Sequence, residues 1–335
     1  VQGVTHCTEQ VLAPLKDRGK LLQALYQRGT QFVEQLTQWQ TPSATESRFV
    51  HWLEVSSGRF KLHRTPMSVA GPMGRHREKL GGSWILTSAT LSVRDSFDYF
   101  CHKLGLQQAQ SASWPSPFDY PNQAFVYHPV GLPSPNAQDY IKICLRALWP
   151  LLQISQGRAF LLFTSHRGLQ LAAAILKKHW SGALLVQGDA PKSVLLERFR
   201  QQKAAVLLGT GSFWEGVDVK GEDLSLVMID RLPFMPPDDP MVEAKESDLK
   251  AKGLSSFVHY QLPEAVIAMK QGCGRLIRDA QDQGVLVLCD PRLKTKSYGQ
   301  LFINSLPKLD WVYDAATAKA RLSDMFETMD ESVDL

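Results

Sequence analysis

The sequence predicts an α/β fold in which a parallel sheet is flanked by helices. From about residue 137 onward, short apolar segments alternate with longer segments of helical periodicity. Several of the apolar segments end in hydroxyl or charged residues, as strands do when they open onto a ligand-binding edge. This alternation is typical of a sheet whose two faces are covered by helices.

The composition indicates an ordinary globular protein. The chain has 335 residues, of which 44% are hydrophobic and 21% are charged, enough for two compact domains. A net charge of +4 permits nucleic-acid binding without requiring it. No apolar run is long enough to span a membrane, and the start lacks a secretory signal, so we expect no membrane partner and a cytoplasmic protein.

Cysteine usage excludes two classes of site. The five cysteines contain no C-x-x-C pair, which argues against a disulfide framework and against a zinc site, and we expect no metal ligands and mainly buried thiols. The chain begins with valine, so an internal start with a missing upstream portion is one interpretation.

The first part of the chain predicts helices followed by a hairpin. Residues 11–40 place apolar side chains at helical intervals, and residues 49–55 and 59–65 alternate around an "SSG" turn. The stretch from Arg59 to Lys79 is basic. It is either a solvated face or a surface that contacts phosphates.

Residues 81–92, "GGSWILTSATLS", predict a short strand that ends in small and hydroxyl residues, including Ser88 and Thr90. These residues either meet a ligand beyond the strand or form a simple turn into a helix that reaches about residue 104. Residues 111–135 are rich in proline, serine and asparagine and predict a linker. We place a domain boundary there.

Beyond the linker, the predicted elements alternate regularly. Strand 158–163 runs into Thr164, Ser165 and His166, and strand 204–209 runs into the loop "GSFWEGVDVKG". The segment "LSLVMID" is a further buried strand, and the four prolines of "RLPFMPPDDPM" require a rigid loop after it. The remaining predictions are helices 137–153, 166–180, 191–202, 239–251 and 314–328, and strands 183–187 and 284–289.

The stretch 262–284 predicts a helix with a polar face. Gln271, Arg275 and Arg278 are separated by four and then three residues, so they share one face of a helix, while Gly272 and Gly274 leave room for a phosphate. Guanidinium groups bind oxyanions bidentately, which suits a polyphosphate. The alternative is a surface helix whose arginines pair with acidic neighbours.

Four of these segments together resemble a known family. "TSATL", "LLFTSH", "GSFWEGVDVKG" and "QGCGRLIRD" are similar, in order, to the third to sixth motifs of XPD-like superfamily 2 helicases. "SFWEGVDVKG" with "IDRLPFMPPDDP" resembles the bacterial DinG and YoaA branch, and the YoaA-like members most. The resemblance extends over most of the chain. It implies a RecA-like fold and an ATP-dependent 5′ to 3′ DNA helicase of replication or repair.

Other motifs of these helicases are missing from the chain. It contains no G-x-x-x-x-G-K-[ST] phosphate loop and no D-E-x-H strand end for magnesium, and it lacks the four cysteines of an iron–sulfur cluster. The resemblance therefore implies a C-terminal part that shares ATP and Mg²⁺ with an upstream domain and cannot turn over ATP alone. Residues 1–48 would end a helical arch, 49–125 a first RecA-like domain, and 126–335 would be the second.

The resemblance also implies roles for particular residues. Arg275 and Arg278 would act as arginine fingers on ATP, with Gln271 bonding the nucleotide or the attacking water. Ser88 and Thr90 would couple hydrolysis to DNA movement. The nucleotide cleft would also include a loop that provides Glu215, Gly216 and Asp218, of which Glu215 and Asp218 are otherwise explained as helix caps.

Single-stranded or forked DNA would meet a second group of residues. By the resemblance, the backbone contacts come from Thr164, Ser165, His166 and the loop around Arg231. Trp214 either stacks on a base or packs in the core.

The amphipathic end of the chain, after Asp310, either packs on its own domain or docks a partner, which for YoaA-like helicases would be the chi accessory subunit of the replicative polymerase. A different class of function remains open: a RecA-like docking platform for a replication or repair protein, without hydrolysis of its own.

Overall fold

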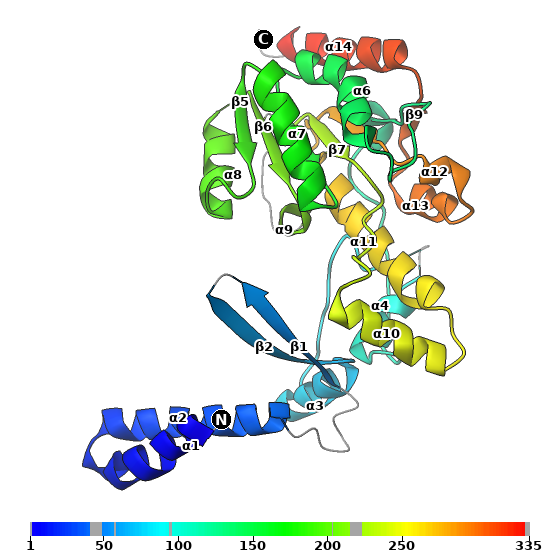
Figure 1. Ribbon diagram of the computed structural model, residues 1–335. Coiled ribbons are helices and arrows are strands. Elements are labelled where there is room, and N and C mark those ends of the chain that lie inside the picture. Colours follow the sequence, from blue (N-terminus) through cyan, green and yellow to red (C-terminus); the bar gives the residue numbers. More distant parts are fainter. Residues whose placement is uncertain are drawn as a thin grey trace. The chain divides into compact units, whose positions relative to one another are not determined.

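The computed structural model describes residues 2–40, 49–56, 58–93, 96–202, 204–214 and 223–331. The chain divides into two compact units (Figure 1), which are described separately. The hairpin unit comprises residues 1–82, 102–106 and 236–256, and the sheet unit comprises residues 83–101, 107–235 and 257–335.

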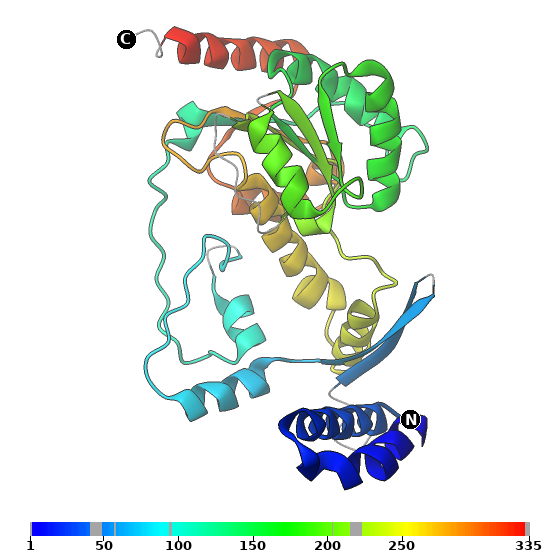
Figure 2. The same ribbon diagram turned by 90° about the vertical axis from the view of Figure 1, so that its left-hand side faces the viewer.

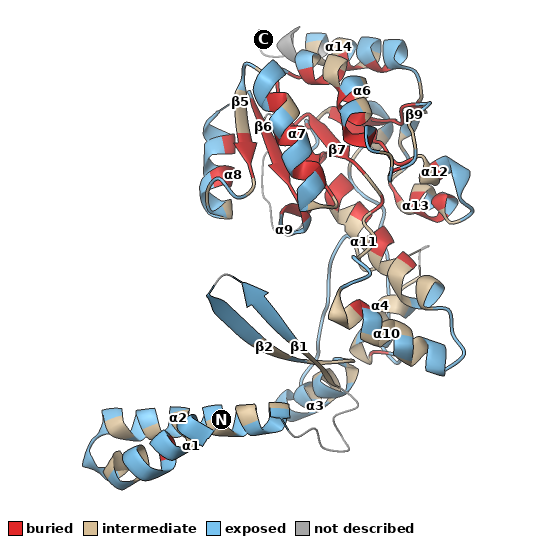
Figure 3. Cartoon of the chain, in the orientation of Figure 1, coloured by how far each residue is buried: buried red, intermediate tan, exposed pale blue. Residues whose placement is uncertain are grey.

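The hairpin unit contains the predicted helices and hairpin. Its antiparallel strands pair Phe49 with Pro66 and Ser56 with Arg59, as the alternation in the sequence predicts. Few of its residues are buried (Figure 3). Its elements are α1 (Gln2–His6), a π-helical segment (Cys7–Leu12), a 3₁₀ segment (Ala13–Arg18), α2 (Lys20–Gln40), β1 (Phe49–Ser56), β2 (Arg59–Pro66), α3 (Ala70–Leu80) and α10 (Pro240–Ala251).

The sheet unit is built on seven parallel strands in the order β5-β6-β4-β7-β8-β3-β9. The parallel sheet confirms the predicted fold class. The strands are β3 (Ala124–Tyr127), β4 (Ala159–Leu162), β5 (Ala183–Val186), β6 (Ala205–Gly209), β7 (Leu226–Ile229), β8 (Gly284–Leu288) and β9 (Asp310–Val312).

Helices cover both faces of this sheet. In Figure 2, α6 and α7 (green) stand to the right of the strands and α8 (yellow-green) lies on the other side. The helices of the unit are α5 (Tyr120–Gln123), α6 (Tyr140–Ile154), α7 (His166–His179), α8 (Lys192–Gln201), α9 (Gly211–Trp214), a π-helical segment (Phe257–Gln261), α11 (Leu262–Cys273), α12 (Arg292–Thr295), α13 (Gly299–Ser305) and α14 (Ala315–Glu331), while α4 (Asp98–Leu104) runs from one unit into the other.

Alternate residues of each central strand enter two separate cores. Phe160 and Leu162 of β4 pack with residues of α8, α9 and α11, whereas Ala159 and Leu161 pack with residues of α6, α7 and α14. All four side chains are at most 1% exposed. A strand buried on both faces must be apolar at every position, which explains the continuous apolar runs in the sequence.

Two predictions about residues 81–135 are wrong. Residues 81–92 form no helix or strand, and Ile85 is 87% exposed. A strand is stabilised by the ladder bonds of its neighbours, and no described strand pairs with this segment. The predicted linker 111–135 contains β3, which lies between β8 and β9, so the parallel sheet begins before the proposed boundary at residue 125.

The end of the chain packs on its own unit, as one of the two alternatives predicted. Ala318 and Leu322 of α14 are fully buried, and the Arg158 guanidinium lies 4.3 Å from the Phe326 ring centroid. Figure 1 shows α14 along α6, and both helices contribute to the same core. The apolar side of α14 therefore packs in the core, while docking of a partner at the end of the chain stays a prediction.

The prediction of mainly buried thiols holds in part. Cys144, Cys273 and Cys289 are buried, but Cys7 is exposed and Cys101 is half-buried. Among the described helices, none combines the length and the apolar character needed to cross a bilayer.

The packing of α14 gives a test of the fold. Leu322→Ala should destabilise the sheet unit by about 2–5 kcal/mol, because it opens a cavity in a closed core. Lys319→Ala, on the exposed side of the same helix, should change stability by less than about 0.5 kcal/mol. Urea denaturation followed by circular dichroism measures both, and equal midpoints would show that α14 is not part of the core.

Candidate functional site

A cavity of about 420 Å³ brings together several of the predicted site residues. Ser88, Thr90, Gln271 and Arg275 all line it, although they come from two segments far apart in the sequence. Lys270 and the backbone around Gly274 line it as well. Arg278 is not among the lining residues. The predicted nucleotide group is therefore assembled in part.

Hydrogen bonds to α11 anchor the residues that follow the "TSATL" segment. The Lys270 Nζ donates to the carbonyl of Ser92 at 2.9 Å, and the Tyr99 hydroxyl donates to Glu264 at 2.5 Å. Within the segment, the Ser88 hydroxyl lies 3.2 Å from the Thr90 hydroxyl. No described strand pairs with the segment.

The prediction that Gln271, Arg275 and Arg278 share a helical face is wrong. Helix α11 ends at Cys273, and the amide groups of Gly274 and Arg275 then bond to Lys270 and Gly272 in a tight turn. Glycine on both sides of Cys273 favours this end, because it is a poor helix former. The turn separates the two arginines, and only Arg275 is directed to the cavity.

Arg275 also holds the segment that precedes "EGVDVKG". Its Nε and Nη2 donate to the carbonyl of Trp214 at 3.1 and 2.5 Å. The Trp214 side chain is 4% exposed, which confirms core packing as the correct alternative for this residue. Its ring lies so near Gly272 that a Cβ there would come within 2.9 Å of it. Gly272 is thus required for contact between α9 and α11.

Three predicted nucleotide residues lie outside the described residues. Glu215, Gly216 and Asp218 belong to the stretch 215–222, which begins directly after Trp214. Their roles stay predictions.

The groups around the cavity suit an oxyanion rather than a metal. Lys270, Gln271 and Arg275 carry hydrogen-bond donors, the chemistry that binds the phosphates of a nucleotide. A magnesium ion requires carboxylate or other oxygen ligands. Among the described residues, no cluster of three or more histidines, cysteines or carboxylates is positioned to bind a metal.

The predicted DNA-contacting residues lie at the carboxyl edge of the sheet. Thr164 and Ser165 follow β4, His166 begins α7, and Arg231 follows β7, the strand next to β4. Ser165 caps α7, since its hydroxyl accepts from the amide of Gly168 at 3.1 Å. His166 is exposed, and Thr164 and Arg231 are half-buried. The four residues are gathered at one edge, as the topology requires.

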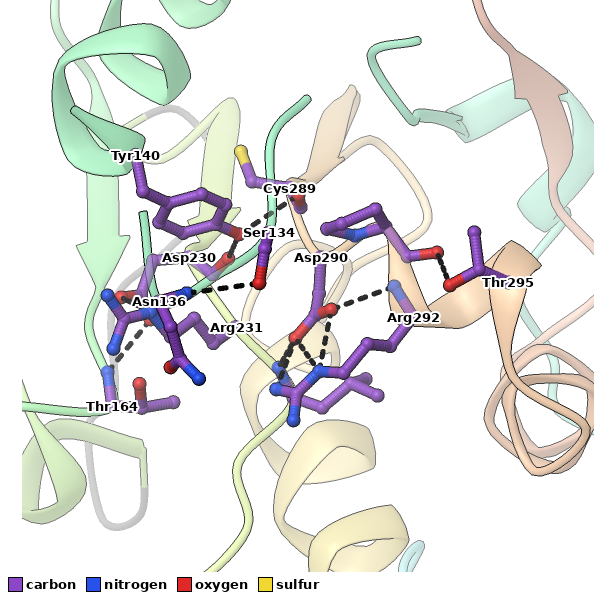
Figure 4. Close-up of polar contacts among 12 residues, drawn as sticks. Ser134, Asn136, Tyr140, Thr164, Asp230, Arg231, Cys289, Asp290, Arg292 and Thr295 are labelled. Carbon is purple, nitrogen blue, oxygen red and sulfur yellow. Dashed lines mark hydrogen bonds and ion pairs between the residues drawn. The ribbon is translucent and has the colours of Figure 1, made fainter. Parts of the chain in front are cut away.

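Two buried carboxylates organise this edge (Figure 4). Asp230 accepts from the amide of Thr164 at 2.9 Å. Asp290, which follows β8, accepts from the amide of Leu232 at 2.8 Å and from the Arg292 guanidinium at 2.6 Å. Each carboxylate therefore ties the end of its own strand to the loop after a neighbouring strand.

Two further side chains act in the same way. The Tyr140 hydroxyl donates to the carbonyls of Asp230 and Cys289, at 2.6 and 3.0 Å. The Gln187 side chain accepts from the amide of Thr210 at 2.6 Å, which joins the ends of β5 and β6. We call these four side chains, Tyr140, Gln187, Asp230 and Asp290, the polar rim.

The polar rim and Lys270 are not among the residues that the sequence predicts for the site. Asp230, Asp290 and Gln187 each come one or two residues after a buried apolar strand, so the rule that ligands gather at strand ends would have selected them. Lys270 carries no such signal, because its partner Ser92 is distant in sequence.

Residues 148–309 match the family described as the helicase C-terminal domain. ATP-dependent DNA helicase YoaA of Escherichia coli is 42% identical over 301 residues, which cover 90% of this chain and 47% of that protein. ATP-dependent helicase DinG of Mycobacterium tuberculosis is 33% identical over 296 residues, which cover 84% of this chain and 43% of that protein.

The chain belongs to the YoaA- and DinG-like helicases. It spans about half the length of the curated relatives it matches. A relative from Bacillus subtilis, 3′-5′ exonuclease DinG, is 39% identical over 67% of this chain and 25% of that protein. Members of this YoaA and DinG group thus differ in named activity.

Solved structures agree on the fold. An XPD helicase structure matches 80% of this chain and 48% of its own length, with a TM-score of 0.57 and 18% identity. An apo XPD structure matches 93% of this chain and 61% of its own length, with a TM-score of 0.56 and 14% identity. The YoaA- and DinG-like chain therefore has an XPD-type, RecA-like sheet.

The burial of Asp230 predicts that this residue makes the stability of the fold depend on pH. The side chain is fully buried, and the loss of hydration raises its pKa from 3.8 to about 6. A raised carboxyl pKa lowers stability as pH rises from the unfolded pKa to the folded one. Asp230→Asn keeps an acceptor for Thr164, so it should raise the melting temperature at pH 8, with a difference that shrinks as pH falls below 6.

Asp314 provides a control of opposite sign. A hydrogen bond from the amide of Thr317 lowers the pKa of Asp314, so the charged form contributes stability above its unfolded pKa that is lost in acid. Asp314→Asn should therefore have the lower melting temperature at pH 8, again converging in acid. A pH-independent difference for Asp230→Asn would show that the carboxylate is not destabilised by burial.

Proposed function

We propose that this chain forms the second motor domain of an ATP-dependent DNA helicase. The observation that carries the proposal is the cavity in which Arg275 and Gln271 meet Ser88 and Thr90. The YoaA and DinG relatives named as ATP-dependent helicases support it. The chain would contribute charge neutralisation and DNA contacts, while a domain that carries a phosphate loop would hold the nucleotide.

On the nucleotide side, the residues of this chain act on the terminal phosphate. Arg275, fixed by the carbonyl of Trp214, neutralises charge that develops on the phosphate oxygens, and Gln271 orients the nucleotide or the attacking water. Arg278 is the second candidate finger. Glu215, Gly216 and Asp218, which follow Trp214 in the sequence, would sense the nucleotide.

The "TSATL" segment would couple ATP hydrolysis to movement of the DNA. Ser88 and Thr90 share the cavity with Arg275, and Ser92, which directly follows the segment, is bonded to Lys270 of α11. A change in the contacts of Arg275 would therefore be transmitted to residues 88–92. Coupling of this kind requires physical contact between the elements involved.

On the DNA side, the carboxyl edge binds a single strand through its backbone. Thr164, Ser165, His166 and Arg231 provide hydroxyl, amide and basic groups, which suit phosphates and carry no base preference. The Ser165 hydroxyl already caps α7, so Ser165 would contribute by fixing the start of that helix, whose amide groups can face a phosphate.

We predict that replacing either arginine by alanine lowers the rate of ATP turnover. In a polypeptide that joins this chain to a phosphate-loop domain, Arg275→Ala or Arg278→Ala should lower kcat on the order of a thousandfold, because a finger acts mainly in the transition state. Arg275→Ala should also lower the melting temperature, since it releases the carbonyl of Trp214. Steady-state ATPase with saturating single-stranded DNA, together with thermal melting, measures both.

Lysine replacements serve as controls, because an ammonium keeps the charge but not the planar fork, and they should restore little activity. Normal kcat in both alanine variants would exclude a catalytic role for the arginines. It would favour the alternative, a docking platform that does not hydrolyse ATP.

The purified 335-residue chain should bind single-stranded DNA weakly and should not hydrolyse ATP. Its affinity should fall with salt, with a logarithmic slope of about 0.7 for each phosphate contact. Arg231→Ala should reduce this slope by about one contact, whereas Lys319→Ala on α14 should not. Fluorescence anisotropy with a labelled oligonucleotide at several salt concentrations gives the slopes. DNA-stimulated ATP turnover by this chain would contradict the shared-site proposal.

A further inference from the structure

Asp230 stands out among the side chains of the carboxyl edge. It is fully buried, yet its Oδ2 has no hydrogen-bond partner among the described residues. Its Oδ1 accepts the amide of Thr164, and its Oδ2 lies 3.8 Å from the Arg231 Nε. One carboxylate therefore contacts two candidate DNA-binding residues, which follow two different strands.

Neighbouring groups on several sides fix the position of the Asp230 side chain. The Tyr140 hydroxyl donates to its backbone carbonyl at 2.6 Å, and the Tyr140 ring lies 5.1 Å from the Arg231 guanidinium carbon. The start of α7 closes the other side, where the Asp230 Oδ2 would be 3.6 Å from a Cβ at Gly168. Arg231 is thus held between the ring of Tyr140 and the carboxylate of Asp230 (Figure 4).

A carboxylate buried in this way lowers the free energy of unfolding, so stability alone does not explain its presence. Burial disfavours its charged form, and a single ion contact at 3.8 Å leaves that cost only partly offset. Asp290 differs, because the same edge gives it a bidentate arginine and two backbone amides. The incomplete pairing of Asp230 is therefore better explained by a positioning role, since groups that define a functional edge are commonly less stable than they could be.

We infer that Asp230 is a positioning residue of the DNA-binding edge: it fixes the Thr164 amide and the Arg231 guanidinium so that both address one strand of DNA. The inference rests on the proposed function. Asp230 itself does not touch DNA, because its side chain is fully buried. Its charge acts through Arg231, and its hydrogen bond acts through Thr164.

A double-mutant cycle tests this role in the 335-residue chain. Single-stranded DNA affinity and its salt slope are measured for the wild type, Asp230→Asn, Arg231→Ala and the double variant. Asparagine can still accept from Thr164 but cannot pair with Arg231, so Asp230→Asn should weaken binding about threefold to tenfold. If Asp230 acts through Arg231, it should add nothing in the Arg231→Ala background.

Two further variants separate positioning from loss of stability. Asp230→Ala removes both contacts and should weaken binding more than Asp230→Asn, with a further decrease in the salt slope. Leu322→Ala destabilises the same unit without approaching the carboxyl edge, and its folded fraction should bind with the wild-type slope. Additive effects in the cycle, or equal slopes in Asp230→Ala and Leu322→Ala, would overturn the inference.

Hydrogen exchange distinguishes failure of the inference from failure of the proposed function. The Thr164 amide should exchange slowly in the wild type and in Asp230→Asn, and at least tenfold faster in Asp230→Ala. Equal exchange in all three would overturn the positioning role directly. If the wild-type chain binds no single-stranded DNA while the exchange rates differ as expected, the proposed DNA contact is wrong, although Asp230 does fix Thr164.

Discussion

The carboxyl edge of the sheet depends on buried side chains that accept or donate hydrogen bonds across neighbouring strands. Parallel strands end together, and the loops beyond them lose the regular ladder that orders their backbone. In this protein Gln187, Asp230 and Asp290 accept the amide groups of those loops, and Tyr140 bonds to two of their carbonyls. The loops therefore acquire fixed positions without regular secondary structure, as a binding edge requires.

A second constraint links the nucleotide side to the same sheet. Helix α11 can contact α9 only because Gly272 has no side chain where the Trp214 ring lies. That contact places the carbonyl of Trp214 within reach of Arg275. The end of α11 and the arginine after it thus act together: Gly272 permits close packing, and Arg275 then bonds to the carbonyl of Trp214.

The family relationship and the geometry answer different questions. Similarity relates the chain to YoaA and DinG, but the two relatives named ATP-dependent helicases are about twice as long, and a third relative carries a different named activity. The structure instead shows that residues of the same motif make different contacts. Arg275 lines a cavity and Arg278 does not, and Ser165 caps a helix while Thr164 is held by a carboxylate.

The sequence by itself determined the alternation of buried strands and helices, because strands with two covered faces must be apolar throughout, and it placed the hydroxyl and basic residues at their ends. It could not determine the elements whose structure depends on distant partners. Residues 81–92 have strand character but no strand to pair with, β3 lies in a stretch that reads as a linker, and α11 ends three turns into a longer helical pattern. The partners of Asp230 and Lys270 were likewise decided only by tertiary structure, since hydrogen bonds to residues 66 and 178 positions away leave no periodic trace in the sequence.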